Sequence, residues 1–313
     1  MPNNMITRTD ASGIIPSPVA REIITAATQE SAVLRMGRRL SNMTSGTYAM
    51  PVLDALPMAY WVNGDNGFKR TSRAAWDRKV IYAEELAVII PIPESVLDDS
   101  DYDIWGEVRP ALVQAFGQKI DAAVLFGTEK PTKWRDSILE TATAAGAVVA
   151  ETDDIYEDIM GVDGVIAKVE ASGYLPTGAL AAVNMRAKLR GLRDNTGNPI
   201  FKTDIQGASR YALDGVPMDF PLNGAFDATA ANMIIGDFSQ LVYAIRQDIT
   251  YKILDQATIV DPSTKEIVYS LAQQDMIALR AVMRLGWEIP NPINPMQEND
   301  EKRTPFAVYA PGA

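Results

Sequence analysis

Residues 99–104, DSDYDI, carry aspartate at every second position, which is how the calcium-binding loop of an EF-hand begins. Such a loop needs glycine at its sixth position, where the chain turns sharply, and a bidentate glutamate at its twelfth. This sequence has Ile104 and Pro110 at those two positions. The segment therefore predicts a solvated or neighbour-facing acidic surface and no dedicated metal site.

The residue types that most often carry acid–base and metal chemistry are missing. The chain of 313 residues has no histidine and no cysteine, which excludes zinc sites built on them and both Ser-His-Asp and Cys-His hydrolysis. Ser239, in GDFSQ, does not lie in a nucleophile elbow, and no P-loop or dinucleotide fingerprint occurs. We predict no catalytic residue and no cofactor. A carboxylate-dependent enzyme stays open as an alternative.

The composition is that of an ordinary globular protein with a strong acidic balance. Hydrophobic residues make up 47% of the chain, and the formal net charge is −11. This charge argues against a protein that neutralises phosphates along its length. No apolar stretch is long enough for a signal peptide or a membrane span. We expect a protein that is made in the cytoplasm and has no membrane contact.

A long helix and a direct strand-to-helix junction are the clearest elements. The apolar run Val88 to Ile92 predicts a buried strand, and Pro93 suits the start of a helical turn. Beyond it, apolar residues recur at four-residue steps and predict a helix that ends at a glycine cap, with Pro110 implying either a start near Glu107 or a kink. The apolar positions are Val108, Leu112, Phe116, Ile120 and Val124, and the cap is Gly127.

Residues 47–92 predict strands with a hairpin at NGDNG, residues 63–67, because paired Asn-Gly steps favour tight turns. Five basic residues and one acidic residue lie between Phe68 and Tyr82. A lone hairpin buries too little to be stable, so we expect a partner surface. The acidic remainder of the chain favours protein over single-stranded nucleic acid as that partner. The predicted contact residues are Trp61, Lys69, Arg70, Arg73 and Trp76.

Four stretches of the sequence, taken in their order along the chain, together resemble a known family. They are AYWVNGDNGFKRTSRAAWDRKVIYAEELAVIIPIPESVLDDS, IWGEVRPALVQAFGQKIDAAVLFG, VNMRAKLRGLRDNTGNPIF, and IIGDFSQLVYAIRQDITYKIL with DMIALRAVMRLGWEIPNP. Together, over residues 16–292, they resemble the Hong Kong 97-type major capsid proteins of tailed bacteriophages. Encapsulins share this fold, and an encapsulin-type protein compartment is the alternative reading.

The resemblance implies an α+β fold of the Hong Kong 97 type with a peripheral and an axial domain. Residues 1–45 would form an N-terminal arm and helix, and residues 46–92 the extended hairpin loop with its strands. Residues 93–134 would carry the peripheral domain with its long spine helix, and residues 135–240 the axial domain. Residues 241–313 would supply the closing strands of the peripheral domain and a C-terminal arm.

The resemblance also implies the function and the partners. Many copies would assemble as pentamers and hexamers into an icosahedral shell around motor-packaged double-stranded DNA, bound without sequence specificity. The chain starts directly with the arm, so we expect a separate scaffolding protein. The resemblance also implies a portal, and a decoration protein stays open as a further partner. Lys69 is the candidate cross-link lysine, although a non-covalent shell is favoured because no partner residue is marked. The hairpin's expected partner on an adjacent copy is the cluster Asp98, Asp99, Asp101 and Asp103.

Overall fold

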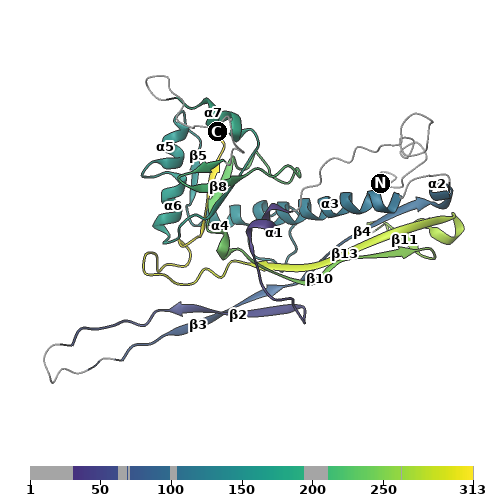
Figure 1. The fold of residues 1–313 in the computed structure, drawn as a ribbon. Coiled ribbons are helices and arrows are strands. Elements are labelled where there is room, and N and C mark those ends of the chain that lie inside the picture. Colours follow the sequence, from purple (N-terminus) through teal and green to yellow (C-terminus); the bar gives the residue numbers. More distant parts are fainter. Residues whose placement is uncertain are drawn as a thin grey trace.

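The computed structural model shows an elongated body with a compact unit on one side and a long hairpin projecting from one end (Figure 1). The predicted N-terminal arm and the turn of the hairpin lie outside the described residues. The structure describes residues 31–62, 69, 71–98, 104–193, 211–261 and 263–312, without the side chains of residues 105 and 107.

A four-stranded sheet runs the length of the elongated body, in the order β1-β10-β13-β4. Strand β13 pairs antiparallel with both β10 and β4, so the two longest strands lie side by side, and β4 forms an edge. A short two-stranded hairpin, β11–β12, extends the far end. The strands are β1 (Arg38–Arg39), β4 (Glu84–Pro93), β10 (Val242–Leu254), β11 (Thr258–Val260), β12 (Ile267–Ser270) and β13 (Met276–Glu288), and the 3-10 turn η2 (Leu271–Gln273) precedes β13.

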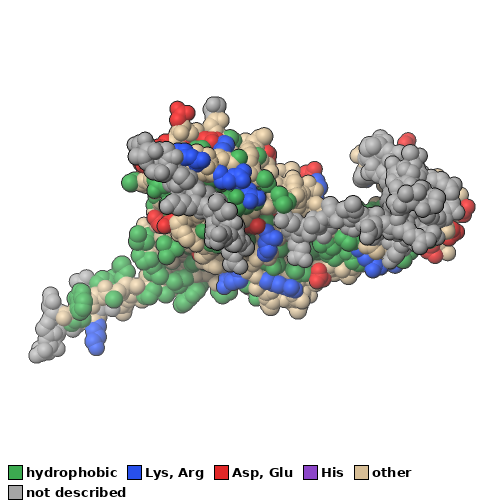
Figure 2. Space-filling view, turned by 45° about the horizontal axis from the view of Figure 1, so that its top comes forward, with side chains coloured by type: hydrophobic (Ala, Val, Ile, Leu, Met, Phe, Trp, Pro, Cys, Tyr) green, Lys and Arg blue, Asp and Glu red, His purple; other side chains and the backbone are tan. Residues whose placement is uncertain are grey.

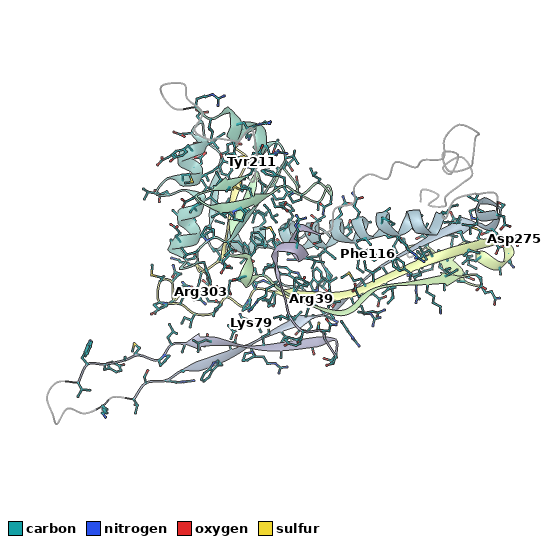
Figure 3. All side chains as sticks on the ribbon, viewed as in Figure 1. Arg39, Lys79, Phe116, Tyr211, Asp275 and Arg303 are labelled. Carbon is teal, nitrogen blue, oxygen red and sulfur yellow. The ribbon has the colours of Figure 1, made fainter. Side chains whose placement is uncertain are left out.

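The long helix α3 (Ile104–Phe126) lies along this sheet, and the predicted apolar stripe faces it. Figure 3 shows Phe116 between the helix and the strands. The alternative start near Glu107 is wrong, because the helix begins at Ile104 and includes Pro110. Proline removes one backbone donor, but burial of the apolar face beyond Pro110 stabilises a helix that continues through this residue. Gly127, with a φ of 74°, ends it as expected.

The predicted junction is also present: β4 ends at Pro93 and helix α2 (Glu94–Asp98) follows without a loop. Ile92 and Val96 are buried together with Ile104 at the start of α3. Pro91 and Pro93 are both paired with β13, opposite Ala278 and Met276, so the ladder with β13 continues to the end of β4. Glu94 lies in the first helical turn, where the helix dipole favours an acid. The junction therefore fixes the direction in which the chain leaves the sheet.

The compact unit is built on a six-stranded sheet of order β5-β14-β9-β6-β8-β7. Its central strands are buried at every position, and helices α4 and α6 pack against β14. The strands are β5 (Val148–Ala150), β6 (Gly178–Ala181), β7 (Ala212–Leu213), β8 (Val216–Asp219), β9 (Met233–Gly236) and β14 (Phe306–Ala310). The helices are α4 (Ile138–Ala144), α5 (Ile155–Met160), α6 (Val165–Ala171), α7 (Met185–Gly191) and the 3-10 turn η1 (Phe238–Gln240).

One part of the sequence-based division differs from the structure. Residues 241–313 were expected to close the elongated sheet and end in an arm. Strands β10 and β13 do close that sheet, but β14 pairs with β9 and β5 in the six-stranded sheet. Its residues Phe306, Val308 and Tyr309 are fully buried. A segment this apolar is more stable as an inner strand than as an exposed arm.

One buried carboxylate, that of Asp121, connects α3, the compact unit and the N-terminal end of the described chain. Asp121, on α3, accepts hydrogen bonds from the Ser31 hydroxyl and from the backbone N–H groups of Ala32 (2.9 Å) and Val33 (3.1 Å), at the start of helix α1 (Ala32–Met36). The Asn223 amide, from the compact unit, donates a fourth bond at 2.7 Å. Burial raises the pKa of the Asp121 carboxyl, and the four donors offset part of that rise.

Candidate assembly interface

The projecting hairpin is formed by β2 (Thr47–Ala55) and β3 (Ala75–Tyr82), which pair antiparallel from Thr47 opposite Tyr82 to Ala55 opposite Ala75. Beyond these pairs the two arms run on toward the turn (Figure 1). Trp61 is 100% exposed and Trp76 is 67% exposed. Two bulky aromatic side chains in water on a thin arm indicate a surface that is covered in the working protein.

The predicted basic residues lie on the same arm. Lys69 and Arg73 are exposed, and Arg70 lies outside the described residues. Lys79, on β3, approaches Asp77 only at 4.0 Å. Figure 2 shows basic and hydrophobic side chains together on the projecting arm. Trp61, Lys69, Arg73 and Trp76 are thus all exposed on the projecting hairpin, and their role in an interface stays a prediction.

One residue of the predicted acidic partner, Asp98, lies at the other end of the molecule. Asp98 is exposed at the end of α2, and Figure 1 places α2 at the end of the body opposite to the hairpin. Asp99, Asp101 and Asp103 lie outside the described residues. Within one chain the hairpin and Asp98 do not meet, so a contact between them requires two copies.

The root of the hairpin is fixed firmly to the body. Ile81 is fully buried in a cluster with Met43, Val242 and Ala244. The backbone N–H of Ala83 donates to the Gly46 carbonyl at 2.9 Å and so closes the base of the hairpin itself. The Trp134 indole, from the body, donates to the Tyr82 carbonyl at 3.2 Å. The hairpin therefore leaves the sheet in a direction set by several independent contacts.

Gly286 allows this close crossing, and we expect Gly286→Ala to disturb it. A Cβ atom at this position of β13 would overlap the Tyr82 carbonyl oxygen and the Ile81 side chain. Overpacking of this kind lowers the free energy of unfolding by about 1–3 kcal/mol. Urea unfolding of unassembled subunits measures it. Gly191→Ala is the matched control, because a Cβ there meets no atom within 4 Å; equal stability of the two variants would contradict the prediction.

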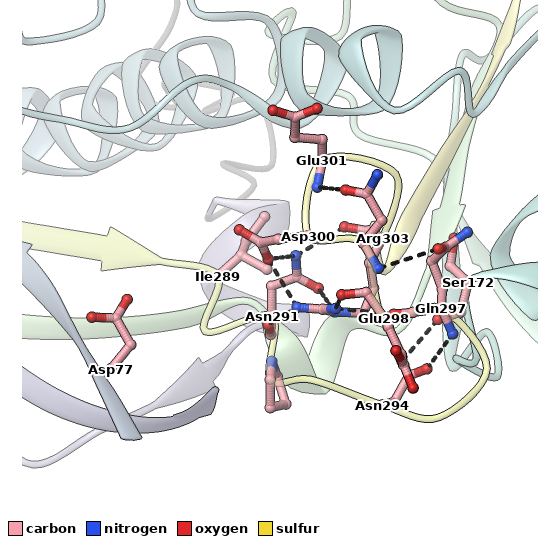
Figure 4. Close-up of polar contacts among 12 residues, drawn as sticks. Asp77, Ser172, Ile289, Asn291, Asn294, Gln297, Glu298, Asp300, Glu301 and Arg303 are labelled. Carbon is pink, nitrogen blue, oxygen red and sulfur yellow. Dashed lines mark hydrogen bonds and ion pairs between the residues drawn. The ribbon is translucent and has the colours of Figure 1, made fainter. Parts of the chain in front are cut away.

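A second set of contacts, which reaches the hairpin farther from its root, was not predicted from the sequence. Residues 289–305, here called the corner loop, connect β13 with β14 and are held by the buried guanidinium of Arg303, which is 4% exposed (Figure 4). Arg303 donates to both the side-chain oxygen (3.2 Å) and the carbonyl (3.1 Å) of Asn291, and to Asp300 at 2.9 Å. It also donates to the carbonyls of Gln297 and Glu298.

The corner loop contacts both neighbouring parts of the chain. The Ile293 N–H donates to the Leu53 carbonyl of the hairpin at 3.1 Å, and Asn294 donates to the Ser172 carbonyl of the compact unit at 2.9 Å. The Tyr174 hydroxyl donates to Asn291 at 2.9 Å, and burial raises the pKa of that hydroxyl. One loop thus ties together the hairpin, the elongated sheet and the compact unit.

This arrangement suits assembly. Within the described part of the chain, no three acidic, histidine or cysteine side chains form a group that could hold a metal ion. No helix among those residues has the length and apolar character to cross a membrane. A rigid body, an exposed aromatic and basic arm, and an acidic residue at the far end define the class: a structural protein that contacts other copies of itself.

Comparison with known proteins identifies the family within that class. Residues 11–296 match the model of the phage capsid family, and the chain belongs to this family. It is similar to a solved structure from Microbacterium phage Oxtober96, at 35% identity and a TM-score of 0.82, covering 98% of this chain and 99% of that one. A structure from Mycobacterium phage Adephagia gives 33% identity and a TM-score of 0.81, with 98% of each chain covered.

A curated relative agrees with the structural match. The "Major capsid protein" of Staphylococcus phage 80alpha is 25% identical over 291 residues, which cover 92% of this chain and 85% of that protein. The predicted α+β class and the resemblance to Hong Kong 97-type capsid proteins are therefore confirmed. The chain is a phage capsid protein, and its relatives are structural proteins.

Proposed function

We propose that this protein is the major capsid protein of a phage, and that many copies form pentamers and hexamers of an icosahedral shell around motor-packaged double-stranded DNA. The observation that carries the proposal is the whole-length match to phage structures, at 98% coverage and a TM-score of 0.82. The net charge of −11 supports packaging by a motor, because shells that condense DNA by affinity need basic surfaces. No catalytic role is assigned.

We assign the peripheral domain to the four-stranded sheet with α3 and the axial domain to the six-stranded unit, which would face the centre of each pentamer or hexamer. A separate scaffolding protein, a portal and a decoration protein are the further partners of this proposal. The subunit would be made in the host cytoplasm and carried in the virion. Negative-stain images of the expressed protein test the shell: icosahedral particles support it, and a stable monomer by light scattering opposes it.

An encapsulin-type compartment is the second candidate, because encapsulins have the same fold. The content of the particles separates the two. Phage particles purified from infected cells should contain double-stranded DNA and carry a portal and tail, whereas an encapsulin would enclose a cargo protein. The same particles test Lys69 as a cross-link lysine: a monomer band on a denaturing gel means a non-covalent shell.

We further propose that the basic residues of the hairpin contact Asp98, Asp99, Asp101 and Asp103 of an adjacent copy. The hairpin and α2 lie at opposite ends of one subunit, which supports a contact between copies. Each exposed ion pair contributes only about 0–1 kcal/mol. Repeated in every subunit of a shell, however, such pairs set register and the rate of association.

Charge reversal tests this contact. The triple variant Lys69→Glu, Arg70→Glu, Arg73→Glu is expected to block shell formation while leaving the melting temperature of the subunit unchanged, because Lys69 and Arg73 are exposed. Replacing the four aspartates with lysine in the same variant should restore shells, because the two reversed surfaces then attract each other again. The neutral triple glutamine variant is the control and should assemble slowly. Normal shells from the glutamate variant would remove these residues from the interface.

A further inference from the structure

A polar cleft of about 630 Å³ separates part of the hairpin from the compact unit. Lys79 lines the cleft from β3, Arg303 lines it from the corner loop, and residues of α4 form a further wall (Figure 3). The cleft begins just beyond the buried root, since Lys79 follows Val80 and Ile81 outward along β3. Over this stretch the hairpin is therefore not packed directly against the compact unit.

Farther out, the corner loop reaches the hairpin. The Ile293 N–H donates to the Leu53 carbonyl at 3.1 Å. Leu53 lies about 20 Å from Thr47, at the root, at roughly 3.3 Å per residue of strand. The pairing of β2 with β3 changes register between Leu53 and Ala55, and such a bulge bends the strand and interrupts the ladder. The corner loop thus contacts the hairpin at the place where the hairpin's own ladder is interrupted.

The corner loop itself is stiff. The five hydrogen bonds of the buried Arg303 guanidinium, at 2.9–3.2 Å, all end on oxygen atoms of this loop. Ile293 and Asn294, which make the outward contacts, lie between Pro292 and Pro295. Proline fixes its own φ and restricts the residue before it. A loop held in this way transmits the position of one end to the other.

The other end of the loop is fixed on the compact unit. The Asn294 amide donates to the Ser172 carbonyl at 2.9 Å. The approach is close, because a Cβ atom at Gly173, which has a φ of 80°, would overlap the Asn294 side chain. The hairpin is therefore supported at two points, at its root on the elongated sheet and at Leu53 through the corner loop. A hairpin held only at its root could pivot, whereas the second support opposes that motion.

We propose that the corner loop is a strut that sets the angle between the hairpin and the compact unit. Ile293 is its contact with the hairpin, and Arg303 is the positioning residue that keeps the strut stiff. The consequence for assembly rests on the proposed function. A hairpin that already has its working angle loses less conformational freedom when copies associate, and such preorganisation favours binding. The strut itself is a property of the single subunit.

Distances between two spin labels test the strut in unassembled subunits, because the chain has no cysteine and labels can be placed at will. One pair joins Trp76→Cys, opposite Leu53 in the hairpin, to Val162→Cys on the compact unit. These side chains are 67% and 90% exposed. Ile293→Pro removes the N–H that meets Leu53 and is expected to widen the distribution of this distance about twofold, because a segment with fewer contacts opens more readily. Ile293→Ala keeps the N–H and should leave the width unchanged.

A second pair of labels separates motion of the hairpin from motion of the compact unit. Val162→Cys with Ile253→Cys, on β10, should keep its width in Ile293→Pro. Arg303→Gln should widen the Trp76–Val162 distribution too, because glutamine cannot bridge the oxygens that the guanidinium holds. An unchanged Trp76–Val162 width in Ile293→Pro would overturn the proposal, even where Arg303→Gln fails to fold. Equal widening of both label pairs would also overturn it, since the compact unit would then have moved.

Shell formation gives a further readout. Ile293→Pro is expected to lower the yield of closed shells about fivefold relative to Ile293→Ala, because the hairpin is then less preorganised. The melting temperatures of the two unassembled variants should be closely similar. Equal shell yields would contradict the consequence for assembly. Absence of shells from the unmodified chain would instead contradict the proposed function, and it would leave the strut, which the spin labels test on single subunits, standing.

Discussion

Replacing Asp121 with alanine is expected to lower the free energy of unfolding of the subunit by about 3–5 kcal/mol. The carboxylate is fully buried and has no basic partner among its hydrogen bonds, which come from Ser31, Ala32, Val33 and Asn223. Alanine would leave the two backbone N–H groups and the Asn223 amide without an acceptor. Each unpaired buried donor costs about 1–3 kcal/mol, and water entering the space recovers part of that loss.

Two further variants calibrate the measurement. Asp121→Asn keeps one acceptor oxygen and should be intermediate, whereas Ser31→Ala removes a single donor and a helix cap and should cost about 1 kcal/mol. Urea unfolding of unassembled subunits gives all three values. A change of less than 1 kcal/mol for Asp121→Ala would mean that the donors find other acceptors.

The Phe116→Ala variant should lose a similar amount of stability, about 3–5 kcal/mol, for a different reason. Phe116 is 4% exposed and packs in the main core between α3 and the elongated sheet. Alanine removes apolar contacts and leaves a cavity between α3 and the sheet, which the surrounding structure fills only in part. Thermal melting of subunits measures the loss, with Ala111→Gly, on the exposed face of α3, as a control limited to helix propensity, about 1 kcal/mol. Unchanged melting of Phe116→Ala would mean that the phase assigned to the helix is wrong.

Much of the elongated body could be predicted because its signals are local. The four-residue spacing from Val108 to Val124 fixes the buried face of α3, and Gly127 has the positive φ that its capping role requires. Pro110 was misleading, since propensity argues for a helix start after it while burial of the following turns stabilises a longer helix. The packing of α3 against the sheet therefore determines where this helix begins.

The proposed interface could be recognised from the sequence only in part. Trp61 and Trp76 were proposed because tryptophans beside basic residues form a visible pattern, and the structure shows both side chains exposed. Arg303 left no such pattern: nothing in its sequence neighbourhood marks it as buried, and its role follows from carbonyls that only the folded corner loop brings together.

The position of β14 has a consequence for synthesis of the protein. This strand follows every other strand along the chain, yet it lies between β5 and β9 in the six-stranded sheet. Until it has left the ribosome, β5 has no neighbour and β9 keeps an open edge. A translation product that stops short of β14 therefore lacks the strand that joins β5 to β9, so this unit can be completed only at the end of synthesis.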